Sequence, residues 1–439
     1  MSRIGLMGDN SVGFVNTLLD IWNNGDCAVL FDWKMPIGVL EEMFYSTGIE
    51  KCYIDSRLFR GTDFQNVTIN IVTYNGSDAL ISPLPREIYG KYKDDYSNNE
   101  AVIIFSSGTT GKSKGVILSH YAISNNADAI AEYMDIGERD CIYIVKSLIH
   151  SSTVVGELLV ALKRKVKMLL GTTMVPHRYV LRNIEKFSVS HICLNPKLLS
   201  MYSVEARLND YNLTSLKSIY VSGSLLDQNL YCEASSIFSF SGIYNMYGLT
   251  EAGPRVSSQT DICKKGNSVG YPIRDVKIMI VNEMGVAVDQ GVCGIIHVDT
   301  PNKYIGYVEG TEKHSSLYLD WLNTGDIGYF DKDGELFVVG RVDDVINIDS
   351  HKIYPGSIEE VVMKHPDVLE CSVVALAIQD KTVIGCLYVT QTNRILPLRD
   401  FLSSQLLPYE MPRVFKLCEE LPRNNGKIMV EKVKKILVE

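Results

Sequence analysis

The first 54 residues alternate between short apolar runs and amphipathic segments, and this alternation constrains the fold more than any other feature of the chain. Runs of strand character alternate with segments of helical spacing in the order 3–7, 12–22, 27–31, 37–45 and 51–54. Gly25 closes the first helical segment, because glycine accepts the left-handed conformation that commonly ends a helix. Strands that alternate with helices predict a parallel sheet flanked by helices.

The pattern of predicted strands and helices changes twice further along the chain. Strand and helix alternation continues at 166–170, 180–186, 191–194 and 218–221, after an exposed polar loop at 94–100. From about residue 268, short strands at 276–281, 294–298 and 336–339 surround Asp331-Lys332-Asp333-Gly334, which predicts a hairpin. The last part predicts a small α+β unit with a helix, two strands and two helices at 356–365, 371–378, 384–390, 398–407 and 428–437. We therefore predict an α/β protein with domains at 1–342 and 343–439.

Length and composition restrict the class of protein. A chain of 439 residues is long enough for two or three domains. A net charge of -9 argues against a nucleic-acid partner, and no apolar run approaches the ~20 residues of a membrane helix. The ten cysteines form no C-x-x-C pair, which favours free thiols in a reducing compartment. We expect a cytoplasmic protein without a membrane or a metal cluster.

The stretch FSSGTTGKSKG, at residues 105–115, has the character of a phosphate-binding loop. It follows an apolar run at 101–105 and precedes apolar residues at helical spacing, so it is predicted to join a strand to a helix. Its Gly-Lys-Ser does not fit the nucleoside-triphosphatase spacing, because Ser106 stands where that motif needs glycine. Small hydroxyls and glycine amides can surround phosphate oxygens, but an ordinary surface loop has the same composition.

Three later stretches carry groups that suit a nucleotide. Tyr247, Thr250 and Glu251 place a ring, a hydroxyl and a carboxylate in one short segment, which suits a base, a phosphate and Mg²⁺. Asp326 lies in a tight turn and could bond a ribose diol, and Arg341 follows a strand. Taken singly, a core tyrosine, a turn aspartate and a surface ion pair explain them equally well.

Taken in order, these stretches resemble the adenylate-forming superfamily of acyl- and aryl-CoA ligases, adenylation domains of peptide synthetases and luciferases. SSGTTGKSKG is similar to its phosphate loop, with Ser113 where proline is usual. YGLTEAG and NTGDIGYFDKDGELFVVGR match the adenine and ribose motifs, and PRNNGK resembles the motif that delivers a catalytic lysine. The resemblance spans the chain. It implies a large domain of layered α/β sheets with a small β-barrel-like subdomain, followed by a small mobile domain.

The resemblance also implies which residues bind ATP and Mg²⁺. The phosphates would be bound by Ser106, Ser107, Thr109, Thr110 and Lys114. The adenine would be bound by Ser222, Gly223, Ser224, Asn245, Tyr247 and Gly248, and the ribose by Asp326 and Arg341. The catalytic group would comprise Thr250 on the α-phosphate, Glu251 as the Mg²⁺ ligand and Lys427, with Asp343 as the hinge of the small domain.

The chemistry agrees with such a site. A carboxylic acid is already ionised at neutral pH, so its attack on the α-phosphorus needs charge neutralisation rather than a general base. Lys427 is predicted at the start of the helix 428–437, where the helix dipole disfavours a cation. We therefore interpret this lysine as a ligand-binding residue, although Glu431 could also pair with it.

The acid pocket is predicted in outline from the same resemblance. It would include His150, Ser151, Gly223 and Met246, although a histidine in such a run can also be an ordinary core residue. Amino-acid-activating domains usually place an aspartate just after this histidine, and here residues 151–153 are Ser-Ser-Thr. This difference favours an aryl or a simple acyl acid as the substrate.

Two departures from the family pattern bear on the second half-reaction. The region before the phosphate loop is short, and residues 347–352 lack the glycine that commonly lines the pantetheine tunnel. The predicted acceptor is the thiol of CoA or of a carrier protein's phosphopantetheine. The alternatives are an enzyme that stops at the adenylate or transfers to an amine, and an inactive homologue that binds nucleotide.

Overall fold

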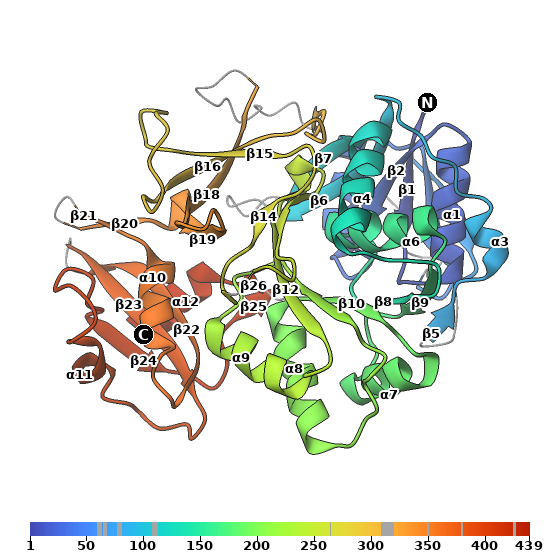
Figure 1. Cartoon of the computed structure of the whole chain (residues 1–439). Helices are drawn as coiled ribbons and strands as arrows, with labels where there is room; N and C mark the ends of the chain where they lie inside the picture. Colours follow the sequence, from blue (N-terminus) through green and yellow to red (C-terminus); the bar gives the residue numbers. More distant parts are fainter. Residues whose placement is uncertain are drawn as a thin grey trace.

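The computed structural model describes most of the chain. It covers residues 1–58, 64, 68–76, 81–107, 113–263, 265–308, 320–348, 351–378, 381–424 and 427–439, without the side chains of residues 107, 113, 347, 351, 352, 424 and 427. Three sheets make up the larger N-terminal part, and a smaller α+β unit follows them (Figure 1). No described helix is long and apolar enough to cross a membrane, and all ten cysteines are free thiols.

The first sheet confirms the predicted alternation. Its strands, in spatial order, are β17 (Gly306–Tyr307), β7 (Ser113–Ser119), β6 (Glu100–Ser107), β2 (Cys27–Phe31), β1 (Arg3–Met7), β3 (Lys51–Asp55) and β4 (Asn70–Tyr74). The strands from β6 to β4 are parallel. Its helices include α1 (Val12–Asn23) and α2 (Ile37–Thr47). Ser11 caps α1 by accepting a hydrogen bond from the Phe14 amide at 3.1 Å.

The predicted strand-to-helix connection at the phosphate loop is wrong. The segment after the loop is the strand β7, antiparallel to β6, and the helix α4 (His120–Tyr133) begins only after it. Val116 and Leu118 pack into the core beneath α1 and α4, whereas Ile117 packs on the other face of the sheet. Both faces of β7 are covered, so its short apolar run lacks the alternation that identifies a half-buried strand.

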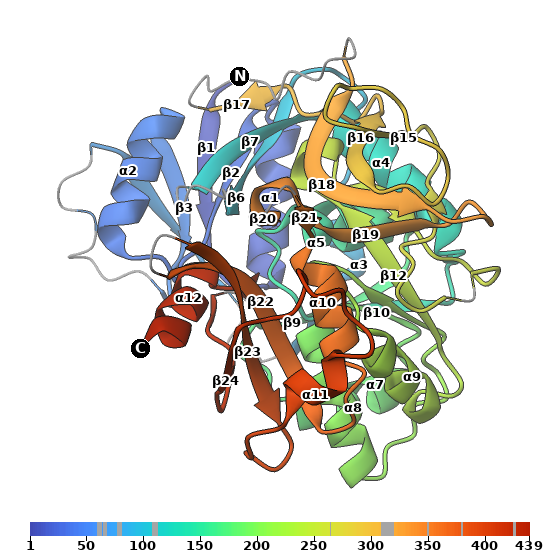
Figure 2. The same cartoon turned by 90° about the vertical axis from the view of Figure 1, so that its left-hand side faces the viewer.

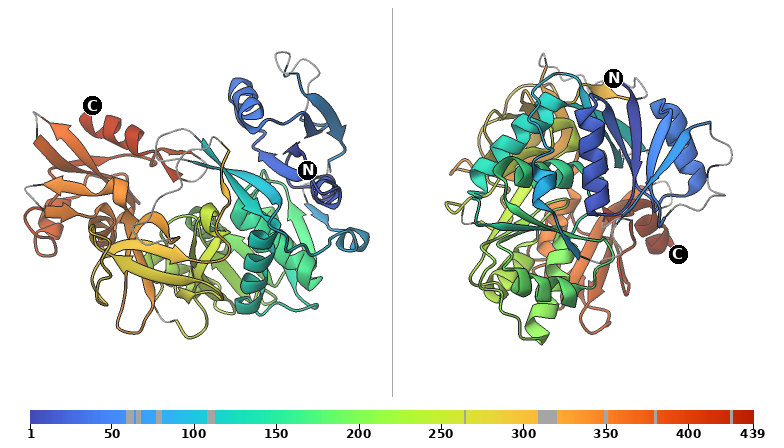
Figure 3. Two further views of the ribbon diagram at one scale, coloured as in Figure 1. Left: turned by 90° about the horizontal axis from the view of Figure 1, so that it is seen from above. Right: turned by 90° about the vertical axis from the view of Figure 1, so that its right-hand side faces the viewer.

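The second sheet lies beside the first and carries most of the helices (Figure 3). Its strands, in spatial order, are β14 (Tyr271–Pro272), β13 (Arg255–Ser258), β12 (Gly242–Gly248), β11 (Ser218–Val221), β10 (His191–Leu194), β8 (Cys141–Ile144), β9 (Lys167–Gly171) and β5 (Ile81–Pro83). Its helices are α3 (Arg86–Tyr89), α5 (Ser151–Thr153), the π-helix η1 (Val154–Leu159), α6 (Val160–Arg164), α7 (His177–Phe187), α8 (Pro196–Leu208) and α9 (Gln228–Ile237). One apolar core contains residues of α1, α4 and η1 together, so these helices pack between the two sheets.

The third sheet is antiparallel and corresponds to the predicted β-barrel-like subdomain. Its order is β15 (Lys277–Val281), β16 (Gly294–Asp299), β18 (Leu322–Phe330) and β19 (Leu336–Arg341). The predicted hairpin joins β18 to β19. Asp331 Oδ1 accepts hydrogen bonds from the amides of Asp333 and Glu335, each at 2.9 Å. A bulge between Ile327 and Gly328 shifts the register of this hairpin by one residue and places Asp326 opposite Arg341.

The C-terminal unit is built around its own three-stranded sheet. Its elements are η3 (Val342–Asp344), β20 (Ile346–Ile348), β21 (His351–Ile353), α10 (Pro355–Val362), β22 (Val368–Ile378), β23 (Lys381–Thr390), α11 (Leu398–Leu402), β24 (Val414–Leu417), β25 (Arg423–Asn424), β26 (Lys427–Ile428) and α12 (Val430–Val438). The helices α10 and α12 cover opposite faces of the β22–β23 pair (Figure 2), because Val373 packs with α10 and Val374 with α12.

Two predicted helices of this unit differ from the structure. The helix predicted at 398–407 ends at Leu402, where the Ser403 hydroxyl bonds the Asp400 carbonyl at 2.7 Å. Lys427 does not start a helix, because it lies in β26 and the helix begins at Val430. The Met429 amide bonds the Pro422 carbonyl at 2.8 Å and closes the small β25–β26 hairpin. The helix-dipole argument for Lys427 is therefore wrong.

Glu359 of α10 provides a test of the packing of this unit through the pH dependence of stability. Burial raises the pKa of the Glu359 carboxyl to about 7, and the negative charge of Asp344 adds to this rise. The Val373 amide donates a hydrogen bond to the carboxyl at 2.7 Å and opposes the rise. The folded state therefore holds a proton that the unfolded chain releases near pH 4.5. Stability from this group falls as the pH rises from about 4.5 to about 7.

We expect Glu359→Gln to keep the acceptor for Val373 and to remove the cost of ionisation. The free energy of unfolding should exceed that of the unmodified protein by about 1–3 kcal/mol near pH 8 and match it near pH 4.5. Urea unfolding at the two pH values measures this difference. A difference of equal size at both pH values would show that Glu359 ionises normally in the folded protein.

Candidate active site

Asp326 joins three strands at one end of the second and third sheets. The Tyr247 hydroxyl donates to Asp326 Oδ2 at 2.6 Å, and Arg341 Nη1 lies 3.1 Å from Asp326 Oδ1. Tyr247 and Asp326 are each 8% exposed, whereas Arg341 is exposed. Burial, with the negative charge of Asp326 beside it, raises the pKa of the Tyr247 hydroxyl well above its ordinary value. The Tyr247 hydroxyl therefore keeps its proton at physiological pH and donates a hydrogen bond to the carboxylate.

The turn that carries Asp326 depends on the residues just before it. Thr324 Oγ1 accepts from the Asp326 amide at 3.0 Å, and Asn323 Oδ1 accepts from the Gly325 amide at 2.9 Å. Gly325 has a φ of 71°, and a Cβ there would lie 2.9 Å from Arg341 Nη2. Glycine therefore lets the guanidinium lie against the turn.

Thr250 and Glu251 lie in the short 3₁₀ helix η2 (Thr250–Ala252), just after β12. The hydroxyls of Thr250 and Ser151 are 2.9 Å apart. This bond joins the segment after β12 to the segment that contains α5. It brings together a residue predicted for the α-phosphate and one predicted for the acid pocket.

Tyr307 is a member of this site that the sequence did not reveal. Its hydroxyl donates to Glu251 Oε1 at 3.2 Å, and Lys114 Nζ lies 5.5 Å from the centre of its ring. Tyr307 is in β17, which pairs with β7 and so places Tyr307 opposite Val116. The pairing joins residues almost two hundred positions apart. Without β7 recognised as a strand, no signal linked Tyr307 to Lys114.

The residues predicted around adenine differ in their accessibility. Gly223 has a φ of 100°, which favours glycine, and it lies between buried Ser222 and exposed Ser224. Gly248 is exposed, and a Cβ there would lie 2.1 Å from the Pro254 carbonyl oxygen. Asn245 is 2% exposed and donates from Nδ2 to the Ser268 carbonyl at 3.0 Å. In this structure the Asn245 side chain therefore holds the strand β12 against the 268 turn.

The predicted acid-pocket residues lie around the same strand ends. His150 is exposed at the start of α5, and Ser151 behind it is buried. Met246 is buried, and its sulfur accepts a hydrogen bond from the Tyr133 hydroxyl at 3.3 Å. Met246 and Tyr247 are consecutive in β12, so their side chains point to opposite faces of this strand.

Several predicted residues cannot be placed in full. Thr109 and Thr110 lie outside the described residues, and the side chains of Ser107 and Lys427 are not described. Ser106 is paired with Lys114 across the β6–β7 hairpin. The β25–β26 hairpin, which carries Lys427, extends from the C-terminal unit toward the N-terminal part (Figures 1 and 3).

Comparison with known protein families shows the family to which the chain belongs. The family described as AMP-binding enzyme matches residues 1–308, and the family described as AMP-binding enzyme C-terminal domain matches residues 357–427. The chain belongs to the AMP-binding enzyme family. It is an AMP-forming ligase that activates a carboxylic acid with ATP to an acyl-adenylate and then transfers the acyl group to a thiol.

Named relatives and solved structures resemble this AMP-binding enzyme over almost its whole length. A 2-succinylbenzoate–CoA ligase of Bacillus mycoides is 29% identical over 86% of this chain and 78% of its own, and one of Bacillus cereus strain Q1 is 29% identical over 100% and 89%. The O-succinylbenzoate coenzyme A synthetase of Bacillus subtilis in complex with AMP shares the fold with a TM-score of 0.82 and 23% identity, covering 99% of this chain and 88% of that one. An anthranilate CoA ligase in complex with anthranoyl-AMP has a TM-score of 0.85, with 18% identity over 99% and 87%.

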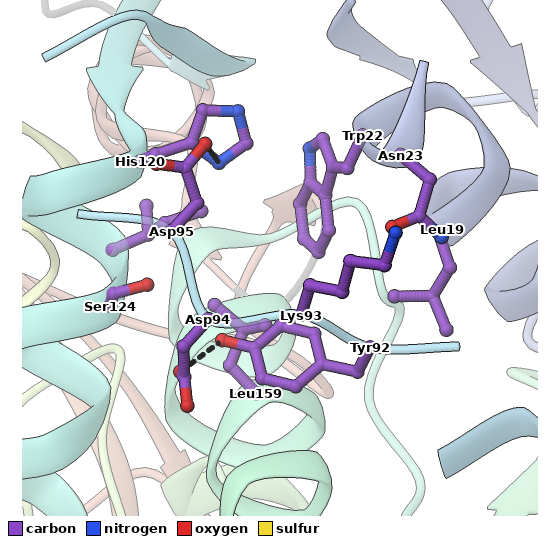
Figure 4. A pocket seen from close by; sticks show the side chains of 11 residues that line it. Leu19, Trp22, Asn23, Tyr92, Lys93, Asp94, Asp95, His120, Ser124 and Leu159 are labelled. Atoms are coloured by element: carbon purple, nitrogen blue, oxygen red, sulfur yellow. Dashed lines mark hydrogen bonds and ion pairs between the residues drawn. The ribbon is translucent and has the colours of Figure 1, made fainter. Parts of the chain in front are cut away.

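The AMP-binding enzyme also has a hollow that shares no residue with the predicted site. It encloses about 240 Å³ between α1, α4 and the 92–95 segment (Figure 4). Its walls include Trp22 and Tyr92, and His120 Nδ1 lies 3.7 Å from Asp95 Oδ2 there. The Tyr92 hydroxyl also donates to Asp94 Oδ1 at 3.0 Å, and none of the predicted site residues lines this hollow, so it adds nothing to the site.

The bond between Tyr247 and Asp326 can be tested through stability. Tyr247→Phe removes one buried hydrogen bond to a carboxylate, so we expect the free energy of unfolding to fall by about 1–3 kcal/mol. Tyr211→Phe is a matched control, because the Tyr211 hydroxyl donates to Glu205 at the same 2.6 Å but near the surface. Urea unfolding of both variants measures the difference. Equal losses in the two variants would mean that burial adds nothing to the Tyr247 bond.

Proposed function

We propose that the protein activates an aryl carboxylic acid of the 2-succinylbenzoate type and transfers it to coenzyme A. The observation that carries this proposal is a set of linked contacts. Tyr307 contacts both Glu251 and Lys114, and Tyr247 near the end of β12 bonds Asp326 of β18. The relatives that are 29% identical over 86% or more of the chain are named 2-succinylbenzoate–CoA ligases, which supports this choice of acid and acceptor.

The residues of the proposed acid pocket also favour binding of the uncharged part of the acid through apolar contacts. Met246 and Tyr133 present a thioether and a partly buried ring beside β12, and both suit an aromatic group. We assign His150 and Ser151 to the mouth of this pocket, near the reacting carboxylate. No carboxylate follows His150 at residues 151–153, so an amino-acid substrate would lack a partner for its ammonium group.

In the first half-reaction the acid attacks the α-phosphorus of ATP, and pyrophosphate leaves. The acid is already ionised, so the protein's residues position the reactants and neutralise charge. We assign Thr250 to the α-phosphate oxygens, with Ser151 holding its hydroxyl in place, and Lys427 to the charge shared by the carboxylate and the α-phosphate. Asp326 and Arg341 would bind the ribose, and Lys114 the leaving pyrophosphate.

Glu251 fits a Mg²⁺ ion that arrives with ATP. No cluster of three or more His, Cys, Asp or Glu side chains that could hold a metal occurs in the described part of the chain. Mg²⁺ typically takes one or two carboxylates together with substrate phosphates and waters, and a single carboxylate is what this site offers. When bound, Mg²⁺ would neutralise charge on the phosphates. Tyr307 would restrain Glu251 in the orientation that receives the ion.

The domain arrangement gives Asp343 its proposed role. Asp343 lies in η3, between β19 of the third sheet and β20 of the C-terminal unit. Arg341, two residues earlier, is bound to Asp326 of the nucleotide site. We propose that the boundary lies between residues 342 and 343 and that rotation about Asp343 moves Lys427 relative to the site.

The transfer to a thiol involves the glycine-free segment at 347–352. This segment forms the hairpin β20–β21, in which Ile346 pairs with Ile353. Asp349 and Ser350, at its turn, lie outside the described residues. We propose that coenzyme A is the acceptor. A carrier-protein phosphopantetheine, an amine and release of the free adenylate are the alternative outcomes of the test below.

The first half-reaction is tested by ATP–pyrophosphate exchange with 2-succinylbenzoate, benzoate, anthranilate and straight-chain acids. We expect the aryl acids to support exchange and Lys427→Ala to lower its kcat by about 10²–10³, because a charge-stabilising donor is lost. Lys432→Ala, on the exposed side of α12, serves as the control and should keep the full rate. Failure of every acid to support exchange would reject the proposed substrate class.

The second half-reaction is tested by adding coenzyme A or a pantetheinylated carrier protein to the active mixture. We expect the acyl-CoA thioester to accumulate with coenzyme A, followed by mass spectrometry. Accumulation of free adenylate without thioester would show that the enzyme stops after activation. Thioester on the carrier protein alone would reject coenzyme A as the acceptor.

Tyr307→Phe tests the proposed restraint on Glu251. It removes the hydroxyl and keeps the ring beneath Lys114, so we expect the Mg²⁺ concentration for half-maximal exchange to rise about three- to tenfold. The kcat at saturating Mg²⁺ should remain within about twofold. Tyr271→Phe, whose hydroxyl bonds the Asp333 carbonyl away from this site, is the control and should leave both quantities unchanged. An unchanged Mg²⁺ requirement in Tyr307→Phe would exclude this role for the hydroxyl.

A further inference from the structure

Three charged side chains are buried together in the apolar core beneath α5 and β12. Glu157 is fully buried, and Lys146 Nζ lies 3.2 Å from its Oε1. Arg255 is 3% exposed, and its charge also acts on Glu157. Isolated buried charges are costly, so a fold retains them where they are paired. The proposed mechanism assigns no task to any of the three.

Glu157 points into this core because the helix around it has an unusual form. The segment from α5 to α6 is continuous, and its middle, η1, is a π-helix in which Val154, Val155 and Leu158 are also buried. Burial raises the pKa of the Glu157 carboxyl to about 7, and the positive charges of Lys146 and Arg255 oppose this rise. Short π-helical segments occur frequently at functional sites.

Lys146 belongs to the chain segment that leads into the acid pocket. It follows β8 and comes five residues before Ser151. Asn10, in the loop after β1, fixes the backbone on both sides: its Nδ2 donates to the Lys146 carbonyl at 2.8 Å, and its Oδ1 accepts from the Leu148 amide at 2.9 Å. The ion pair between Glu157 and Lys146 therefore restrains the segment that ends at Ser151.

Arg255 belongs to the segment that leaves Thr250. It starts β13, five residues after Thr250. Asn126 of α4 bonds its backbone on both sides, with the Arg255 amide and carbonyl each 3.0 Å from the Asn126 side chain. The guanidinium reaches the π-helix, because a Cβ on Gly156 would lie 3.5 Å from Arg255 Nη2. Among the described residues, Arg255 Nε has no hydrogen-bond partner, and the charge of Arg255 acts on both Glu157 and Tyr133.

We propose that Glu157 is a positioning residue for the adenylation step, and that its carboxylate holds the Lys146 and Arg255 segments so that the hydroxyls of Ser151 and Thr250 stay in contact. The two segments meet at that 2.9 Å contact, and both reach Glu157: Lys146 forms an ion pair with it, and the positive charge of Arg255 acts on it. This inference rests on the proposed function, because it acts through the role assigned to Thr250. We expect Glu157 to affect kcat more than the binding of ATP, because Thr250 is assigned to the α-phosphate, where the reaction takes place.

The experiment compares Glu157→Gln with Glu157→Asp by pyrophosphate exchange. Glutamine keeps the shape and loses the charge, whereas aspartate keeps the charge and loses a methylene group. We expect Glu157→Gln to lower kcat by about tenfold or more with the KM for ATP within about twofold, and Glu157→Asp to lower kcat less. A merely space-filling role predicts the reverse order. Glu132→Gln, which removes an exposed ion pair of α4 with Arg274, is the control and should keep the full rate.

The route through Ser151 is tested by a double-mutant cycle. Ser151→Ala alone should lower kcat, and adding Glu157→Gln to it should lower kcat by less than about twofold more. Losses that multiply in full would overturn the proposal, as would a Glu157→Gln enzyme that matches Glu132→Gln. Thermal unfolding checks that each variant is folded. If Glu157→Gln does not fold, Lys146→Met replaces it in the cycle, and an unchanged kcat in Lys146→Met would overturn the proposal.

The proposed function fails in a different way. If the unmodified enzyme gives no exchange with any acid, the assignment of the substrate is wrong before any variant is compared. If it is active and the Glu157 variants follow the reverse order, the substrate assignment stands and the positioning role is wrong. The two outcomes are therefore distinguishable in one set of measurements.

Discussion

The geometry of the candidate site depends on the hydrogen bond and the ion pair that the Asp326 carboxylate forms. It binds Tyr247 of β12 and Arg341 of β19 at once, so it joins the mixed second sheet to the antiparallel third sheet. Arg341 is also the last residue of β19, next to η3 and the C-terminal unit. One buried side chain thus ties together the parts that carry the residues predicted for the nucleotide. The same three residues hold these parts together in the absence of a ligand.

The sequence predicted the outline of this arrangement well, because its signals are local. The alternation before residue 55 and the turn at Asp331 depend on neighbouring residues, and both are confirmed. The strand β7 was missed because Val116, Ile117 and Leu118 are buried on both faces and show no alternation. Lys427 was placed at the start of a helix because its short hairpin with residues 423–424 has no pattern of its own. In the first case packing on both faces hid the strand, and in the second the strands were too short to show a period.

The residues of the candidate site also divide into those with a local sequence signal and those without one. Thr250, Glu251 and Asp326 were found from motifs. In the structure the first two follow β12, whose Tyr247 bonds Asp326 in the middle of β18. Tyr307 was not found, because its contact with Glu251 arises from a two-residue strand paired with β7. Glu157 was not found either, because a single acidic residue in an apolar run looks like an exposed helix position. Its burial follows from the π-helical turn and from two cations, Lys146 and Arg255, that come from other parts of the sequence.

Asn10 shows how the first sheet reaches the acid pocket without contributing a residue to it. Its side chain bonds the backbone of residues 146, 148 and 171, all in the second sheet or just after its strands. A shift of the β1 loop would therefore move the segment that ends at His150 and Ser151. Substitutions in the loop after β1 would therefore act on the residues predicted for the acid pocket from outside that pocket. A search for variants that is confined to the predicted pocket positions would overlook them.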